Sequence, residues 1–141
     1  MAADGRYDVV IAGAGNAALC AALSAREAGA SVLVLEKAPE YLRGGNSYFT
    51  GGLFRFAFEG LDEILELVPG ISEDEAAAMD VGTYPQSAYH ADVMRMTEGL
   101  SDAELAHALV SESYPAMRWM ADHGVRWIPA YGRQAFKQGE V

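Results

Sequence analysis

Apolar residues near the amino terminus form two short runs with a helical pattern between them. The runs are residues 7–12 and 31–36, and each is typical of a strand buried on both faces of a parallel sheet. Residues 17–28 are rich in alanine and leucine at helical spacing, and Gly29 follows where such a helix would end. The pattern predicts a strand–helix–strand unit with a right-handed crossover.

The chain from residue 61 onward has mainly helical patterns. Helices are expected at residues 61–68, from Ser72, at residues 86–97 and from Ser101 to about His123. Ser72 and Ser101 each stand three residues before a glutamate, which is the capping-box spacing of a helix start.

Three further features belong to this carboxyl-terminal half. Pro115 should divide the last helical segment, because a proline ring cannot sit inside an unbroken helix. Gly124 is placed to end that segment. Residues 125–128 are apolar enough to predict a short strand.

Between these halves lie two glycine-rich stretches, residues 43–47 and 50–52, which we expect to be irregular. Only two parallel strands are predicted, whereas a doubly wound sheet has about five or six. The chain is therefore expected to be a fragment of a longer protein or one half of an assembly.

The stretch from Gly13 to Ala18 fits the GxGxxG/A pattern of dinucleotide-binding proteins. Gly13 allows a tight turn out of the strand, Gly15 lets the backbone approach a pyrophosphate, and Ala18 lets the helix pack on the strand. Free N–H groups and the positive end of the helix dipole would then hold the phosphates. Glu36 ends the second strand about 20 residues on, where a carboxylate accepts hydrogen bonds from ribose hydroxyls and repels the 2′-phosphate of NADP. The alternative is a tight turn with a chance acid.

A second glycine-rich cluster, residues 44–47 and 50–52, favours a flavin over a nicotinamide cofactor. The segments VVIAGAGNAALCAALSAREAGASVLVLEKAP, RGGNS and TGG, with ADHGVRW and YGRQAF more loosely, resemble the flavoprotein family of fumarate reductases and succinate dehydrogenases. Within that family the chain is similar to the FAD-dependent tricarballylate dehydrogenases, over essentially its whole length but only over the amino-terminal part of such an enzyme. Two surface turns are the alternative interpretation of this cluster.

The resemblance implies FAD contacts along both glycine-rich segments. Residues implied at the pyrophosphate are Gly13, Gly15, Asn16, Ala17 and Ala18. Residues implied at the adenosine are Glu36 at the ribose, with Lys37 and Ala38 beside the adenine. Residues implied at the ribityl chain and flavin ring are Gly44, Gly45, Asn46, Ser47, Thr50, Gly51 and Gly52. Membrane-linked members attach FAD through a histidine near the position of Ser47, and no histidine occurs between Glu36 and Gly52, so we expect non-covalent FAD.

The predicted fold class is therefore α/β. Residues 1–60 are expected to form an incomplete, Rossmann-like FAD-binding βαβ domain of the three-layer type. Residues 61–141 are expected to be the helical start of a capping or substrate domain, with the remainder of the enzyme missing from the chain.

Composition limits the partners. The formal net charge is −10, and the resulting field repels nucleic-acid backbones and anionic lipid. Cys20 is the single cysteine, which leaves no disulfide or cysteine-based metal cluster and is consistent with a reducing compartment. No apolar stretch is long enough for a transmembrane segment and no signal peptide is evident. We therefore expect a cytoplasmic protein that binds no metal.

No catalytic residue is assigned from the sequence. Three histidines lie in the expected helical segments, where a surface or helix-end histidine is the common case, namely His90, His107 and His123. Arg126 and Arg133 are better suited to meet an anionic substrate, although surface ion pairing is the alternative. Cys20 is expected to be a buried small apolar residue. Met117, Trp119 and Met120 are expected to pack a helix, and the acidic residues 62–75 to form a solvated face.

The resemblance implies a dehydrogenase that oxidises a small polycarboxylate such as tricarballylate to its alkene, by hydride transfer to flavin N5. A separate electron acceptor protein would then reoxidise the flavin. A related flavoprotein of cobalamin synthesis or ketosteroid dehydrogenation is one alternative. The other is a non-catalytic nucleotide-binding module.

Overall fold

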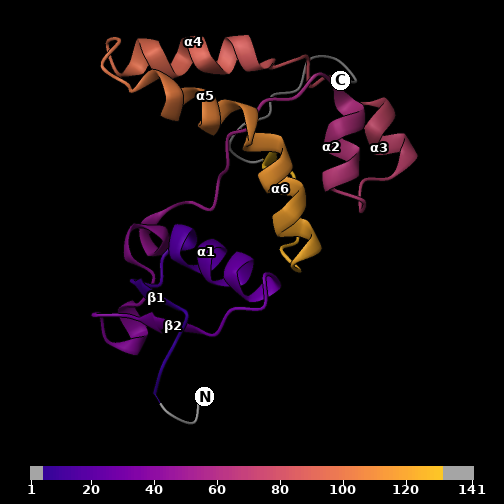
Figure 1. Cartoon of the computed structure of the whole chain (residues 1–141). Helices are drawn as coiled ribbons and strands as arrows, with labels where there is room; N and C mark the ends of the chain where they lie inside the picture. The colour runs from indigo at the N-terminus through magenta and orange to yellow at the C-terminus, as the bar shows by residue number, and fades with distance from the viewer. Residues whose placement is uncertain (1–4, 132–141) are drawn as a thin grey trace. The chain divides into compact units, whose positions relative to one another are not determined.

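The structure, a computed structural model, describes residues 5–131 and divides into two compact units, Met1–Leu53 and Phe54–Val141. The first unit contains strand β1 (Val9–Ala12), helix α1 (Asn16–Glu27) and strand β2 (Val32–Leu35), as Figure 1 shows. The strands pair in parallel, with Val9 beside Val32 and Ala12 beside Leu35. The predicted strand–helix–strand unit and the α/β class are confirmed at this level. The assignment of residues 1–60 and 61–141 to separate functions stays a prediction.

Helix α1 packs on one face of this small sheet. Val9, Ile11, Val32 and Val34 share that face and are half-buried, because alternate residues of a strand point to the same side. On the other face Val10 is 59% exposed and Leu35 is 53% exposed. The expectation that both strands are buried on both faces is therefore wrong for the part of the chain that the structure describes, where a single helix covers a single face.

A hydrogen-bond cluster fixes the strands where they begin. The Asp8 carboxylate accepts bonds from the backbone N–H of Ser31 at 2.8 Å and from its hydroxyl at 2.7 Å. These bonds lower the pKa of Asp8. Because the two strands run parallel and are paired from their first to their last residues, their carboxyl ends meet at one edge of the sheet.

The first of the two glycine-rich stretches is more regular than predicted. Two 3₁₀ helices follow β2, Glu40–Leu42 just before the first stretch and Gly45–Phe49 within and after it. The second begins with a bond from the Ser47 N–H to the Gly44 carbonyl at 3.1 Å, and Gly44 itself has φ +111°, which favours glycine. The prediction of irregular structure was wrong for residues 45–47, because 3₁₀ turns need few residues and leave little periodicity to detect. It is confirmed for residues 50–52, which contain no helix or strand.

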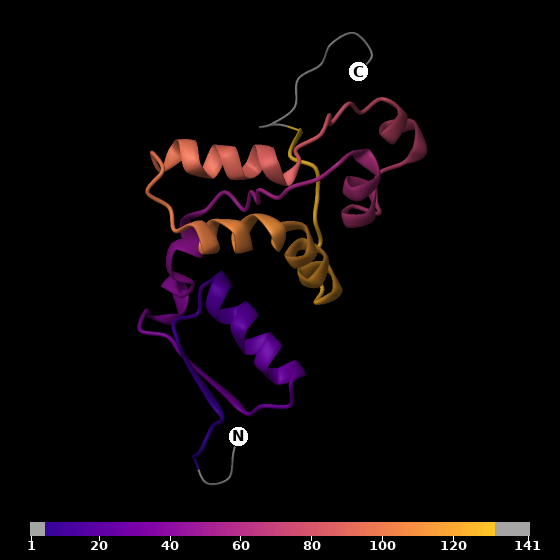
Figure 2. The ribbon, with the colours of Figure 1, turned by 45° about the horizontal axis from the view of Figure 1, so that its top comes forward.

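The second unit is helical, and its helices are α2 (Leu61–Leu67), α3 (Glu73–Ala77), α4 (Gln86–Met96), α5 (Ala103–Ser111) and α6 (Ser113–Asp122). Helices α4 and α5 lie side by side, as Figure 2 shows. All the predicted helices are present. Residues 125–128 are not a strand; instead the Trp127 indole donates to the Met117 carbonyl at 3.0 Å and ties the segment to α6.

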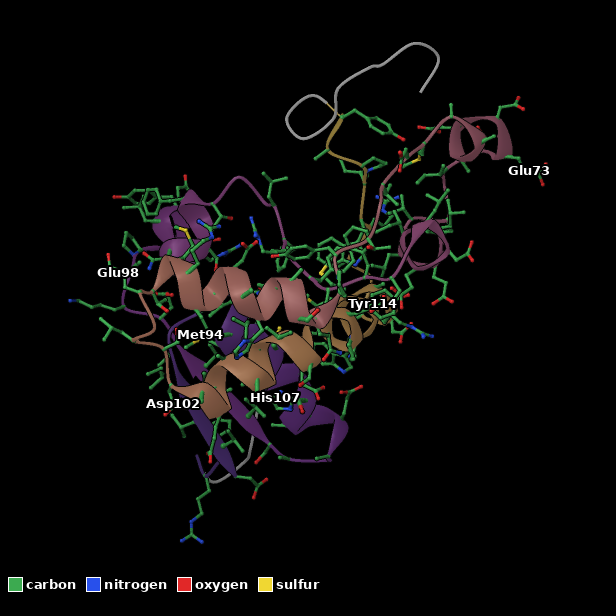
Figure 3. The ribbon with its side chains drawn as sticks, turned by 90° about the horizontal axis from the view of Figure 1, so that it is seen from above. Glu73, Met94, Glu98, Asp102, His107 and Tyr114 are labelled. Atoms are coloured by element: carbon green, nitrogen blue, oxygen red, sulfur yellow. The ribbon has the colours of Figure 1, made fainter. Side chains whose placement is uncertain are left out.

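Two helix boundaries differ from the prediction. Asp102 lies at the start of α5 (Figure 3) and caps it, its carboxylate accepting from the N–H groups of Glu104 and Leu105 at 3.0 Å. The Ser101 hydroxyl instead donates to Thr97 Oγ1 at 2.9 Å. The break before α6 falls at Glu112 rather than at Pro115. Pro115 is the third residue of α6, where the missing N–H removes no helical bond. At α3 the predicted cap is confirmed, with Ser72 Oγ accepting from Glu75 N at 3.2 Å.

The core of the second unit is small. Ala57, Tyr89 and Val110 form the buried cluster, and Tyr84 and Val93 pack against it. The Ala57 N–H donates to Ser113 Oγ at 3.0 Å, which joins the extended segment before α2 to the start of α6. Met117 and Met120 are also buried, which confirms their predicted packing role.

Tyr114 gives this unit an alkaline pH dependence that can be measured. Its hydroxyl donates to Glu66 Oε2 at 2.8 Å, and burial, then this carboxylate, raises the pKa of Tyr114 to about 12. Between pH 10 and 12 the folded protein keeps a proton that the unfolded chain releases, so stability falls as pH rises. Between pH 10 and 12 the free energy of unfolding of Tyr114→Phe should fall by about 2 kcal/mol less than that of the wild type. Urea unfolding followed by circular dichroism at each pH measures it.

Tyr41→Phe is the matched control, because the Tyr41 side chain is 73% exposed. Stability curves of the wild type and Tyr114→Phe that run parallel from pH 9 to 12 would contradict the prediction.

Candidate cofactor-binding site

The carboxyl ends of β1 and β2 bring Gly13 and Glu36 to the same edge of the sheet. Ala12 pairs with Leu35, and the Gly13 N–H donates to the Leu35 carbonyl at 2.6 Å. The chain then turns at Gly13, whose φ of +100° is one that residues with a side chain rarely adopt. Helix α1 starts two residues after Ala14, so the turn, the helix start and Glu36 are neighbours.

Gly15 is required by a close approach of the chain to itself. A Cβ atom placed there would lie 3.2 Å from the Gly44 carbonyl oxygen and 3.5 Å from Ser47 Oγ. The approach of a pyrophosphate is the reason that the sequence predicts for a small residue at Gly15. The structure adds a second reason, which is that the second glycine-rich segment packs directly on the first.

The backbone N–H groups of the turn and helix start divide into two sets. Three are bonded within the unit: Gly13 to the Leu35 carbonyl, Ala14 to Glu36 Oε2 at 2.9 Å, and Asn16 to Ser47 Oγ at 2.9 Å. Within residues 5–131, no acceptor is found for the N–H groups of Gly15, Ala17 and Ala18. Since α1 is twelve residues long and has no acidic residue in its first turn, its positive end can hold an anion.

Glu36 is held ionised by backbone donors. Its carboxylate accepts from Ala38 N at 2.8 Å and from Ala14 N at 2.9 Å, and these bonds, in that order, lower the pKa of Glu36. The backbone N–H groups of Gly44 and Lys37 lower the pKa of Glu36 further, by smaller amounts. Lys37 beside it is exposed, and Ala38 is half-buried.

The second glycine-rich segment lies open to solvent. The residues from Gly45 to Gly52 are exposed, including Asn46 and Gly51. Gly45 and Gly52 have φ of +55° and +71°. Thr50 Oγ1 donates to the Ser47 carbonyl and accepts from the Gly52 N–H, both at 3.2 Å, so this hydroxyl shapes the loop. Two aromatic side chains, Tyr48 and Phe49, are also exposed in this segment, at 56% and 78%.

The remaining candidates gain no catalytic geometry. His90 is half-buried on α4, and His107 lies exposed on α5 (Figure 3). His123 Nδ1 lies 2.7 Å from the Trp119 carbonyl at the end of α6. Arg126 is exposed, and Arg133 lies outside the described residues.

Cys20 is half-buried rather than fully buried, with Sγ 4.0 Å from Asn16 Oδ1, because α1 packs on the sheet through one side only. In the described part of the chain, no group of His, Cys, Asp or Glu residues could hold a metal ion. None of the helices described there is long and apolar enough to cross a membrane.

Sequence reasoning missed a polar cluster in the second unit. Arg55 donates to Tyr84 Oη and Asp92 Oδ2, both at 3.0 Å, and Arg95 donates to Asp92 Oδ1 at 2.9 Å. One carboxylate thus pairs with two guanidinium groups. The i, i+3 spacing of Asp92 and Arg95 was a usable signal, but Arg55 is 37 residues away from Asp92 and nothing local links them.

The same unit has an open hollow of about 230 Å³ lined by Glu59, Glu63, Ser111 and Tyr114, among others. Its carboxylates repel an anionic ligand. The hollow is therefore unsuited to a polycarboxylate.

Comparison with known proteins agrees with the geometry at the strand ends. The family described as "FAD binding domain" matches residues 8–140. Digoxin reductase of Eggerthella lenta is 34% identical over 117 residues, which are 83% of this chain and 18% of the relative. Vinyl phenol reductase of Lactiplantibacillus plantarum is 33% identical over 137 residues, 96% of this chain and 23% of the relative.

A fumarate reductase (cytochrome) of Shewanella frigidimarina is 29% identical over 117 residues, 83% of this chain and 18% of the relative. The chain thus spans about a fifth of the length of these relatives.

Proposed function

The chain belongs to the family of FAD-binding domains, and from that membership we propose that it is the FAD-holding segment of a flavin-dependent oxidoreductase. The predicted cofactor, FAD, and the predicted resemblance to fumarate reductase flavoproteins are confirmed by the family and by the relatives. The three relatives are named as reductases of different substrates, and the activity of the whole protein is what we propose here.

One observation carries the proposal: the free N–H groups of Gly15, Ala17 and Ala18 lie at the strand edge where Glu36 also stands. The donors fit a pyrophosphate, and the carboxylate fits ribose hydroxyls. Gly13 and Gly15 leave this edge clear of side chains. The residues present therefore fit FAD.

When bound, FAD supplies a ring that accepts or donates two electrons. The chain's own residues bind the FAD and orient it. The start of α1 neutralises phosphate charge, Glu36 fixes the adenosine end, and the exposed backbone from Gly45 to Gly52 supplies N–H donors along the ribityl chain and ring. We propose that the FAD is non-covalent, since no histidine occurs between Glu36 and Gly52.

The finer architecture is also a proposal. Val10 and Leu35 are apolar and exposed on the sheet face opposite α1. A further layer covering that face, with additional strands, would complete a three-layer Rossmann-like domain. Residues 61–141 would then begin a capping or substrate domain.

The substrate we propose is a small polycarboxylate such as tricarballylate, oxidised to its alkene, with a separate protein as electron acceptor. This rests on the RGGNS and TGG resemblance. The names of the relatives favour a second candidate, reduction of an alkene by the same flavin. The two differ in the direction of electron flow.

The test is the purified chain itself. We expect it to bind FAD with quenching of flavin fluorescence and to release all of the FAD on denaturation and filtration, because no covalent bond holds it. A chain that neither retains nor titrates FAD would overturn the proposal. In the full-length protein, anaerobic bleaching of the flavin by tricarballylate would support oxidation, whereas reoxidation of reduced flavin by an alkene would support the second candidate.

A further inference from the structure

Ser47 supplies a helix cap from a distant part of the chain. Its Oγ accepts the Asn16 N–H at 2.9 Å, and Asn16 is the first residue of α1. A helix is usually capped by the side chain of the residue before its first turn. Here that residue is Gly15, which has no side chain, so the acceptor comes from 31 residues later.

The surrounding contacts make this bond part of an interlock. The Ser47 N–H donates to the Gly44 carbonyl, and that same carbonyl oxygen lies 3.2 Å from where a Gly15 Cβ atom would be. Gly15, Gly44 and Ser47 thus form one contact between the two glycine-rich segments. The missing side chain at Gly15 is what allows Ser47 to reach the helix start.

The Ser47 hydroxyl also keeps its proton available. A serine hydroxyl has one donor and two acceptor positions, and the bond from Asn16 uses one acceptor. The structure shows no acceptor for the hydroxyl proton among residues 5–131, and the side chain is exposed. The free N–H groups of Ala17 and Ala18 belong to the same first turn of α1.

We propose that Ser47 is a positioning residue that holds the second glycine-rich segment against the start of α1 before FAD arrives. The inference rests on the proposed function, because its consequence is measured as FAD affinity. It differs from the role that resemblance implies, which is contact with the ribityl chain or ring. With Ser47 in place, the donors of α1 and the backbone of residues 45–52 form one prearranged surface, and FAD binding does not have to order it.

Removal of the hydroxyl should weaken FAD binding. We expect Ser47→Ala to raise the FAD dissociation constant by about 3- to 30-fold, the range that the loss of a helix cap gives. Ser47→Thr keeps the acceptor and should stay within about threefold of the wild type. In the FAD-free chain, hydrogen exchange of the Asn16 amide should accelerate in Ser47→Ala and stay slow in Ser47→Thr.

Ser24→Ala is the matched control, since Ser24 is an exposed serine of the same helix. Ser24→Ala should change neither the FAD dissociation constant nor the hydrogen exchange of the Asn16 amide. If Ser47→Ala does not fold, Ser47→Cys carries the comparison, because it keeps the side chain but accepts hydrogen bonds weakly.

The outcomes separate this inference from the proposed function. Unchanged Asn16 exchange in Ser47→Ala, or in Ser47→Cys where that variant is used, overturns the positioning role whatever the affinity, while FAD binding stands. A wild-type chain that binds no FAD overturns the proposed function, and faster Asn16 exchange in the variant then supports the interlock alone.

Discussion

Gly15→Val should raise the FAD dissociation constant by about 10- to 100-fold. The Cβ atom alone would lie 3.2 Å from the Gly44 carbonyl oxygen, and backbone cannot move aside as a flexible side chain does. Overpacking of this kind costs about 1–3 kcal/mol, and each 1.4 kcal/mol is about tenfold in affinity. The valine side chain also covers the edge where the free donors of α1 lie. Titration of the chain with FAD, followed by fluorescence quenching, measures the effect.

Gly70→Val provides the comparison. A Cβ atom at Gly70 would meet nothing within 4 Å, and its φ is not in the left-handed region. This variant should bind FAD like the wild type. Equal affinity of Gly15→Val and the wild type would mean that the two glycine-rich segments separate without cost, and the packing at Gly15 would then have no role in the site.

The strand edge was predictable because its causes are local. Two apolar runs and an intervening helical pattern predict parallel strands, and parallel pairing necessarily places Gly13 and Glu36 at the same edge. The backbone conformation of Gly13 follows from the turn itself. Sequence pattern therefore located the carboxylate and the helix start without any knowledge of distant contacts.

The interlock was not predictable, because it joins residues about 30 positions apart. Nothing in the periodicity relates Ser47 to Asn16 or Gly44 to Gly15. Similar limits explain the error at α5, where Ser101 and Asp102 are adjacent and both are good caps, so that tertiary contacts decided between them. Residues 125–128 had strand-like composition, but a strand also needs a partner, and side-chain packing against α6 prevailed.

Glu36→Arg should lower FAD affinity by at least about 100-fold, the largest effect expected at this site. The native carboxylate accepts from the N–H groups of Ala14 and Ala38, and these bonds lower its pKa, so it is fully ionised at pH 7. An arginine has donors only. It would leave both N–H groups without their acceptor and would offer no acceptor to ribose hydroxyls. Glu36→Gln keeps one acceptor oxygen and should fall between arginine and the wild type. The affinities are measured by FAD titration at pH 7.

Glu40→Arg makes the same change of charge four residues later, at a side chain that is 89% exposed. Because FAD carries phosphates, a general gain of positive charge should if anything favour binding, so Glu40→Arg should bind at least as well as the wild type. A loss confined to Glu36→Arg identifies the carboxylate position itself as the cause. The same affinity in Glu36→Arg and the wild type would remove Glu36 from the site, and with it the reason for placing the adenosine end of FAD at the end of β2.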